Sequence, residues 1–69
     1  MKLSARNVLK GKITELKPGA VNTKVVLELA SGGKIVSIIT KESAEKLGLV
    51  VGKSAYAIIK ASSVMVGVD

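Results

Sequence analysis

The chain has 69 residues and a net charge of +6, and it contains no cysteine and no histidine. A domain of this size buries only about 60% of the surface that its unfolded chain exposes, so its core is marginal. Small domains compensate with disulfides, a metal or oligomerisation, and the composition removes disulfides and the usual zinc ligands. A single domain over residues 1–69 that forms an oligomer is therefore predicted.

Hydropathy and charge limit the location and the partners of the chain. No run of about 18 apolar residues is present, and the first residues lack the apolar core of a secretory signal. We therefore expect a cytoplasmic protein without a membrane partner. The positive charge is compatible with nucleic acid, an acidic membrane or a small oxyanion.

Residues 5–16 predict the first strand, because apolar residues are interleaved with lysines. Gly11, in the middle of this stretch, predicts a bulge or bend. Pro18 followed by Gly19 is typical of a turn with Pro18 at its first central position and a positive φ at Gly19.

Residues 23–30 alternate apolar and polar side chains and are the clearest strand of the chain. The Ser-Gly-Gly stretch at residues 31–33 predicts a tight turn. Residues 34–39 then return as the partner strand, and their apolar run predicts burial on both faces.

The period changes at residues 40–47, which predict one short helix. Thr40 is a good N-cap, and Gly48 is the expected residue after the helix C-terminus. A turn at residues 51–53 precedes strands at residues 54–60 and 62–68. The fold class is therefore mainly all-β: a small five-stranded OB-like barrel with one short helix between strands 3 and 4.

Catalysis is not indicated. The chain has no histidine or cysteine, its four internal glutamates form no recognisable acid/base pair, and no glycine-rich phosphate motif is present. We therefore expect no enzymatic activity, no organic cofactor and no metal cation.

The two ends of the chain carry similar groups, namely a cation, an alanine and hydroxyls. Arginine and lysine supply N–H donors for an oxyanion, and a helix N-terminus also favours negative charge. The alternatives are an ordinary N-cap at Thr40 that bonds the Ser43 amide, a surface ion pair for Arg6, and a solvated strand end at Lys60. The candidate oxyanion ligands are Ser4, Ala5, Arg6, Thr40, Ser43, Lys60, Ala61 and Ser62.

Two rival functions remain open. The charge and the barrel fold also suit a nucleic-acid-binding module, although Tyr56 is the only aromatic residue on which a base could stack, and the lysines are spread along the chain. The third hypothesis is a purely structural or regulatory module.

Five stretches together form a familiar pattern: Ser4-Ala5-Arg6-Asn7, Leu9-Lys10-Gly11-Lys12-Ile13, Ile38-Ile39-Thr40 with Ser43, Leu47-Gly48-Leu49, and Ile59-Lys60-Ala61-Ser62-Ser63-Val64-Met65. In these stretches the chain resembles the molbindins, small cytoplasmic molybdate/tungstate-binding proteins built from a single Mop domain. The resemblance implies a homohexamer, a trimer of dimers of OB-like barrels, that stores or buffers the oxyanion.

The resemblance also implies two kinds of oxyanion site at subunit interfaces. The candidate ligands named above match the first kind. The second lies near a three-fold axis and uses main-chain donors, and the loop of Gly19, Ala20, Val21 and Asn22 is the candidate for it.

Overall fold

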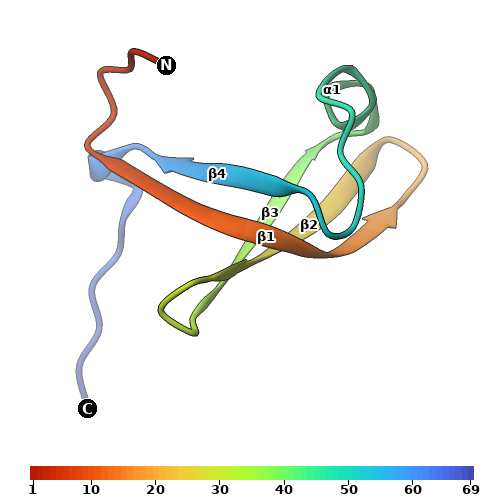
Figure 1. Ribbon diagram of the computed structural model, residues 1–69. Coiled ribbons are helices and arrows are strands. Elements are labelled where there is room, and N and C mark those ends of the chain that lie inside the picture. Colours follow the sequence, from red (N-terminus) through yellow and green to blue (C-terminus); the bar gives the residue numbers. More distant parts are fainter.

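The computed structural model describes all residues, 1–69. Four strands and two short helical segments follow one another along the chain (Figure 1). Their bounds are β1 Asn7–Pro18, β2 Asn22–Leu29, β3 Lys34–Thr40, α1 Lys41–Lys46, β4 Ser54–Ile59 and the 3-10 helix η1 Ala61–Ser63. The predicted mainly-β class is confirmed, as is one α-helix between the third and fourth strands. Neither helical segment has the length and apolar character that a membrane crossing requires.

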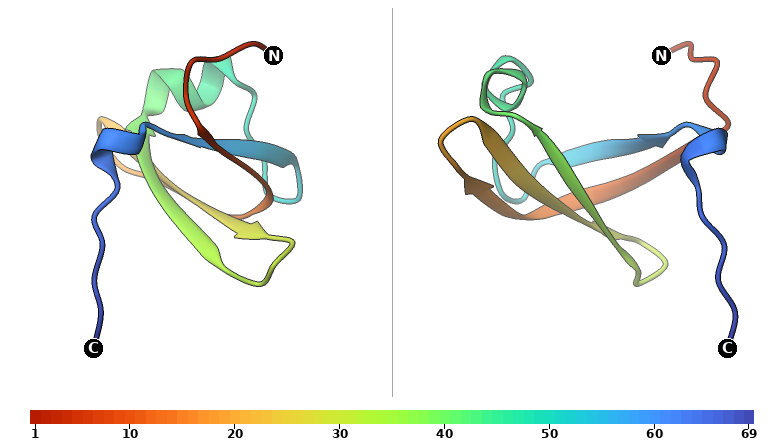
Figure 2. Two further views of the ribbon diagram at one scale, coloured as in Figure 1. Left: turned by 90° about the vertical axis from the view of Figure 1, so that its left-hand side faces the viewer. Right: turned by 180° about the vertical axis from the view of Figure 1, so that it is seen from behind.

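All four strands belong to one antiparallel sheet in the order β3-β2-β1-β4. The sheet is strongly curled into a half-barrel (Figures 1 and 2). Because β1 and β2 are the inner strands, β3 and β4 are the two edges, and each leaves one row of backbone groups without a sheet partner.

Gly11 does not form the predicted bulge. It keeps regular pairing with both neighbouring strands, and the register of β1 against β2 shifts between Ile13 and Glu15 instead. A glycine is required at position 11 because the chains pass closely there: a Cβ atom would lie 2.9 Å from the carbonyl oxygen of Glu28.

The turn between β1 and β2 also differs from the prediction. Positive φ angles occur at Gly32, Gly48 and Gly52 but not at Gly19. The reason is that Pro18 is still paired within β1, so it cannot be a central residue of the turn. The loop is closed by the Gly19 N–H, which donates to the Asn22 carbonyl at 2.7 Å.

The core is very small. Only six of the 69 residues are buried, and the central cluster consists of Ile13, Val25 and Leu27. The predicted burial of both faces of β3 is wrong for a single chain, because Val36 and Ile38 point away from the core and are 60% and 61% exposed. A half-barrel has only one inner face, so the outer face of β3 stays open to solvent.

Both predicted helix caps are confirmed. Thr40 is the N-cap, and its side chain accepts a hydrogen bond from the Ser43 amide. At the other end Gly48 has a φ of 62°, the Gly48 N–H donates to Glu45, and the Leu49 N–H donates to Ala44. This pair of bonds is a Schellman motif, which satisfies carbonyls that the last helical turn leaves free.

The predicted fifth strand, residues 62–68, is not present in the chain. Residues Ala61–Ser63 form η1 instead, and the chain then continues as an extended segment that joins no sheet. Both figures show this segment leaving the half-barrel (Figures 1 and 2). A strand needs a free edge beside it, and η1 turns this segment away from both edges of its own sheet.

Candidate functional site

Six of the eight candidate oxyanion ligands line one solvent-open cavity of about 370 Å³. Three come from the segment that leads into β1 and three from the segment that follows β4. We call this cavity the terminal pocket. Its lining residues are Ser4, Ala5, Arg6, Lys60, Ala61 and Ser62.

The antiparallel pairing of β1 with β4 brings these two segments together. Asn7, the first residue of β1, pairs with Ile59, the last residue of β4. The Asn7 side-chain amide also donates to the Ile59 carbonyl at 3.2 Å. Arg6 and Lys60 are the residues that follow this pair outward on the two segments, so the pairing of Asn7 with Ile59 holds them side by side at the terminal pocket.

Asn7 is the positioning residue to which the sequence alone assigned no role. It stands beside Arg6 in the quoted motif, but its partner is a main-chain carbonyl 52 residues away. A backbone acceptor leaves no signature in a sequence, so only the strand register could reveal this bond.

The turn η1 shapes the other wall of the terminal pocket. The Ser63 N–H donates to the Lys60 carbonyl at 2.9 Å, and the Val64 N–H donates to the Ala61 carbonyl at 3.3 Å. The amides that open such a turn have no acceptor within it. The Ala61 and Ser62 amides are therefore donors at the start of the turn, next to the Lys60 side chain.

The cations of the terminal pocket have no carboxylate partner. The two ion pairs of the structure are Lys24–Glu15 at 3.4 Å and Lys46–Glu42 at 3.2 Å. The alternative interpretation of Arg6 as half of a surface ion pair is therefore not supported. No acidic residue lines the pocket, so its net charge is positive and it can attract an anion.

Thr40 and Ser43 lie at the opposite end of the sheet from the terminal pocket (Figures 1 and 2). The Thr40 hydroxyl accepts the Ser43 N–H at 3.0 Å and donates to the Ser43 hydroxyl at 2.7 Å. The alternative interpretation of Thr40 as an N-cap that bonds the Ser43 amide is thus confirmed. Within one chain, the structure does not bring these two residues to the other six.

The candidate loop for the second site adjoins Thr40 instead. Asn22 pairs with Thr40 across the sheet, and the Val21 carbonyl accepts the Lys41 N–H at 2.8 Å. We call this region, residues 19–22 together with Thr40 and Ser43, the Thr40 corner. The structure therefore divides the eight candidate ligands of the first site into two groups. Six line the terminal pocket, and Thr40 and Ser43 lie beside the loop that is the candidate for the second site.

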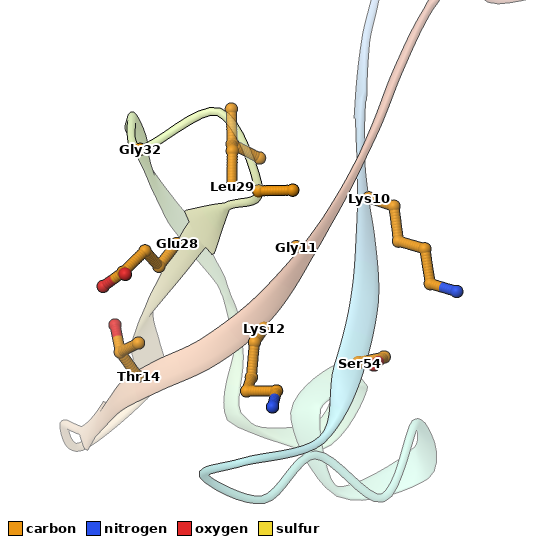
Figure 3. A pocket seen from close by; sticks show the side chains of 9 residues that line it. Lys10, Gly11, Lys12, Thr14, Glu28, Leu29, Gly32 and Ser54 are labelled. Atoms are coloured by element: carbon orange, nitrogen blue, oxygen red, sulfur yellow. The ribbon is translucent and has the colours of Figure 1, made fainter.

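Another hollow, of about 450 Å³, lies over Gly11 on β1 (Figure 3). Lys10, Lys12 and Glu28 line it, and Lys10 Nζ is 6.0 Å from the centre of the Tyr56 ring. Figure 3 shows the Glu28 carboxylate on one side of β1 and Lys10 on the other. Because a carboxylate is part of its lining, this hollow is a poorer place for a dianion than the terminal pocket, and it contains no predicted ligand.

Two comparisons of the sequence with known proteins point to the same family. Residues 3–66 match the TOBE domain family. The chain is 49% identical, over 69 residues that cover both chains completely, to a probable molybdenum-pterin-binding protein of Haemophilus influenzae.

Solved structures resemble the fold closely. MopII from Clostridium pasteurianum, in an apo form, has a TM-score of 0.92 and 48% identity, with 97% of this chain and 100% of MopII covered. The cytoplasmic molybdate-binding protein ModG, with molybdate bound, has a TM-score of 0.95 and 49% identity. That match covers 100% of this chain and 49% of the ModG chain.

Proposed function

The chain belongs to the TOBE domain family, among its molybdenum-pterin-binding (Mop) members, and from this membership we propose that it binds molybdate and holds it without chemical change. The observation that carries the proposal is the terminal pocket, where Arg6 and Lys60 meet without a carboxylate partner. The role is storage or buffering of the anion in the cytoplasm, and tungstate, which has the same charge and shape, is the second ligand.

The chemistry of the terminal pocket suits a tetrahedral dianion. The Arg6 guanidinium and the Lys60 ammonium neutralise its two charges, and the Ser4 and Ser62 hydroxyls donate to its oxygens. Main-chain N–H groups of Ala5 and Ala61 complete the shell. Hydrogen bonds to charged groups contribute about 1.5–3 kcal/mol each, so a few of them account for tight binding even at an open site.

Thr40 and Ser43 join this shell only from another copy of the chain, because they lie at the far end of their own sheet. Of the two, Ser43 is the better donor, since the Thr40 hydroxyl proton is already directed at the Ser43 oxygen. The assembly is a homohexamer, a trimer of dimers, with anions between subunits. The small core and the exposed Val36 and Ile38 support an assembly that covers more apolar surface.

The second, weaker site uses the loop of Gly19, Ala20, Val21 and Asn22 near a three-fold axis. Val21 is 72% exposed, and all four residues of the loop are exposed to solvent. Its donors are backbone amides, so side-chain substitutions in the loop test it poorly. Occupancy counted by native mass spectrometry, with and without molybdate, tests both kinds of site and the hexamer together.

The decisive experiment is isothermal titration calorimetry of Arg6→Ala with molybdate. Arg6 is exposed and makes no hydrogen bond or ion pair in the structure, so the fold survives and circular dichroism is unchanged. We expect most of the binding to disappear. Lys41→Ala, which removes an equal charge at the Thr40 corner, is the matched control and retains the affinity. Wild-type affinity in Arg6→Ala would refute the site.

A further inference from the structure

A cavity of about 430 Å³ lies at the end of the half-barrel that carries α1, and we call it the helix cavity. It is bounded by the end of β1, the start of β2, α1 and the loop that leads to β4 (Figures 1 and 2). Its apolar wall is formed by Leu16, Ala44, Leu49 and Val50. None of the candidate oxyanion ligands lines it, so it is distinct from both proposed molybdate sites.

The base of the helix cavity holds a buried hydroxyl. Thr23 is 4% exposed and is the only polar residue among the six buried ones. None of the side-chain hydrogen bonds of the structure involves its hydroxyl. Because no enclosed side-chain oxygen or nitrogen lacks a partner, this unpartnered hydroxyl must still reach open space, and Thr23 lines the helix cavity.

A hydroxyl in that position has a cost for the fold. Burial of a polar group without a hydrogen bond is unfavourable, and each such group in a folded protein calls for an explanation. A valine at position 23 would occupy the same space without this cost. The explanation that fits the cavity is a hydrogen bond to a molecule bound there.

The rim of the helix cavity carries one free cation and one free anion. Helix α1 has two oppositely charged pairs at the same i,i+4 spacing, Glu42 with Lys46 and Lys41 with Glu45. The first pair has the order that a helix favours, and it forms an ion pair at 3.2 Å. The second pair has the reverse order, which also opposes the helix dipole, and it forms no ion pair. Only the second pair lines the cavity.

These three features define the class of ligand. Glu45 repels a simple anion and Lys41 repels a simple cation, so the rim selects a molecule that carries both charges. The apolar wall accepts an uncharged aliphatic stem. The Thr23 hydroxyl can both donate and accept, which suits an amide, whereas a charged group brought to this depth would lose its hydration.

We propose that the helix cavity binds a free α-amino acid whose side chain has an apolar stem and an uncharged polar end, as glutamine has. The carboxylate of the amino acid pairs with Lys41, its ammonium pairs with Glu45, and the end of its side chain reaches Thr23. This second binding activity goes beyond the proposed function and does not depend on molybdate, because the terminal pocket lies at the other end of the sheet.

The first test is a titration of the nitrogen-labelled chain with L-glutamine, followed by two-dimensional NMR. We expect saturable shifts of the Thr23, Ala44 and Leu49 amides and little change at Arg6 and Lys60. N-acetyl-L-glutamine lacks the ammonium and should bind at least about tenfold more weakly, since one charge-assisted hydrogen bond is lost. L-Glutamate, with a charged side-chain end, should also bind more weakly. The absence of saturable shifts up to the solubility limit of glutamine would overturn the proposal, as would equal affinity for all three compounds.

The second test uses variants whose fold is checked by circular dichroism. Thr23→Val removes the hydroxyl but keeps the shape, so glutamine affinity should fall about fivefold or more while the melting temperature does not fall. Thr23→Ser keeps the hydroxyl and should retain most of the affinity. A folded Thr23→Val chain with wild-type glutamine affinity would refute the role of the hydroxyl and, with it, the proposed ligand class.

An exchange of the two rim charges tests the cation and the anion together. Lys41→Glu combined with Glu45→Lys leaves the net charge unchanged and creates the favoured order, so the two side chains can pair with each other. We expect glutamine binding to be lost and the melting temperature to stay the same or rise. Lys46→Ala, on the same helix but outside the cavity, is the control and should keep the affinity. Wild-type glutamine binding by the exchanged variant would contradict the proposal.

The molybdate and glutamine sites can be separated in one pair of proteins. Arg6→Ala should lose molybdate and keep glutamine, whereas the exchanged Lys41 and Glu45 variant should do the reverse. If Arg6→Ala lost both ligands, glutamine would be bound through the terminal pocket and the assignment to the helix cavity would be wrong. If neither wild-type nor variant chains bound molybdate but glutamine still shifted Thr23, the proposed function would fail and this inference would stand.

Discussion

The terminal pocket and the Thr40 corner both contain hydroxyls close to lysine side chains, but the two regions treat their polar groups differently. At the Thr40 corner the Thr40 hydroxyl serves as donor and as acceptor for Ser43, and the Lys41 amide bonds the Val21 carbonyl. In the terminal pocket, Arg6 and Lys60 form no ion pair. The Thr40 corner uses its polar groups to cap a helix, whereas the terminal pocket leaves its two cations free to bind a ligand.

The difference shows how to separate structural from ligand-binding polar residues in a small domain. A polar group that is satisfied inside the chain stabilises the fold, and its loss is measured as a change in unfolding free energy. A cation without a partner contributes little to folding, and its loss is measured as a change in ligand affinity. Substitutions matched between the two regions therefore test the assignment.

After Arg6→Ala, the largest effect is expected at Lys60. Lys60→Ala removes one charge-assisted hydrogen bond, about 2 kcal/mol, which corresponds to roughly a 30-fold weaker molybdate affinity. Lys41→Ala at the Thr40 corner should change the affinity by less than about threefold, because rim charges act mainly through long-range attraction. Calorimetry at constant ionic strength measures both, and equal losses in the two variants would mean that net charge, not the terminal pocket, determines binding.

A smaller effect is expected at Asn7, which joins the two walls of the terminal pocket. Asn7→Ala deletes the hydrogen bond to the Ile59 carbonyl and should cost about 1 kcal/mol in unfolding free energy. The molybdate affinity should fall about fivefold, because the two cations are held less firmly relative to each other. Thr14→Ala, which deletes a side-chain hydrogen bond to the Val26 carbonyl outside both candidate sites, is the control and should leave the affinity unchanged. An Asn7 variant with normal affinity would show that strand pairing alone positions Arg6 and Lys60.

At the Thr40 corner the expected loss is one of stability. Thr40→Ala removes the N-cap of α1 and should cost about 1 kcal/mol, which lowers the melting temperature by roughly 4–8 °C for a domain of this size. Thr40→Ser keeps the hydroxyl, so its melting temperature should stay close to that of the wild-type chain. Thermal melts must be compared at one protein concentration, because assembly makes the midpoint depend on it. An unchanged midpoint in Thr40→Ala would argue that the cap is not needed in the assembled protein.

The smallest effect is expected at Ser43, whose hydroxyl proton is free to reach an anion bound by another copy. Ser43→Ala should weaken molybdate binding by about two- to threefold, the range for one neutral hydrogen bond at an open site. The melting temperature without molybdate should change little, since the Ser43 amide still donates to Thr40. If neither quantity changes, Ser43 does not belong to the ligand shell.

Much of the local structure could be read from the sequence, because short-range physics determines it. The Ser-Gly-Gly turn needs Gly32 in a positive φ, and the helix is bounded by Thr40 and Gly48, whose roles depend only on near neighbours. The predictions of a bulge at Gly11 and of a positive φ at Gly19 were wrong because each depended on a segment distant in the sequence. Gly11 is explained by the approach of Glu28 from β2, and Gly19 by the continued pairing of Pro18 within β1.

The sequence by itself determined four of the five predicted strands, the helix and the residue types of the candidate site, since periodicity, caps and the positions of cations are properties of short stretches. Only the tertiary structure decided how those residues are grouped. The register of β1 against β4 unites Arg6 with Lys60 and places Thr40 at the other end of the sheet. It also leaves the last apolar segment without a strand partner, because which chains pair is set by contacts between residues far apart in sequence, and no local pattern records them.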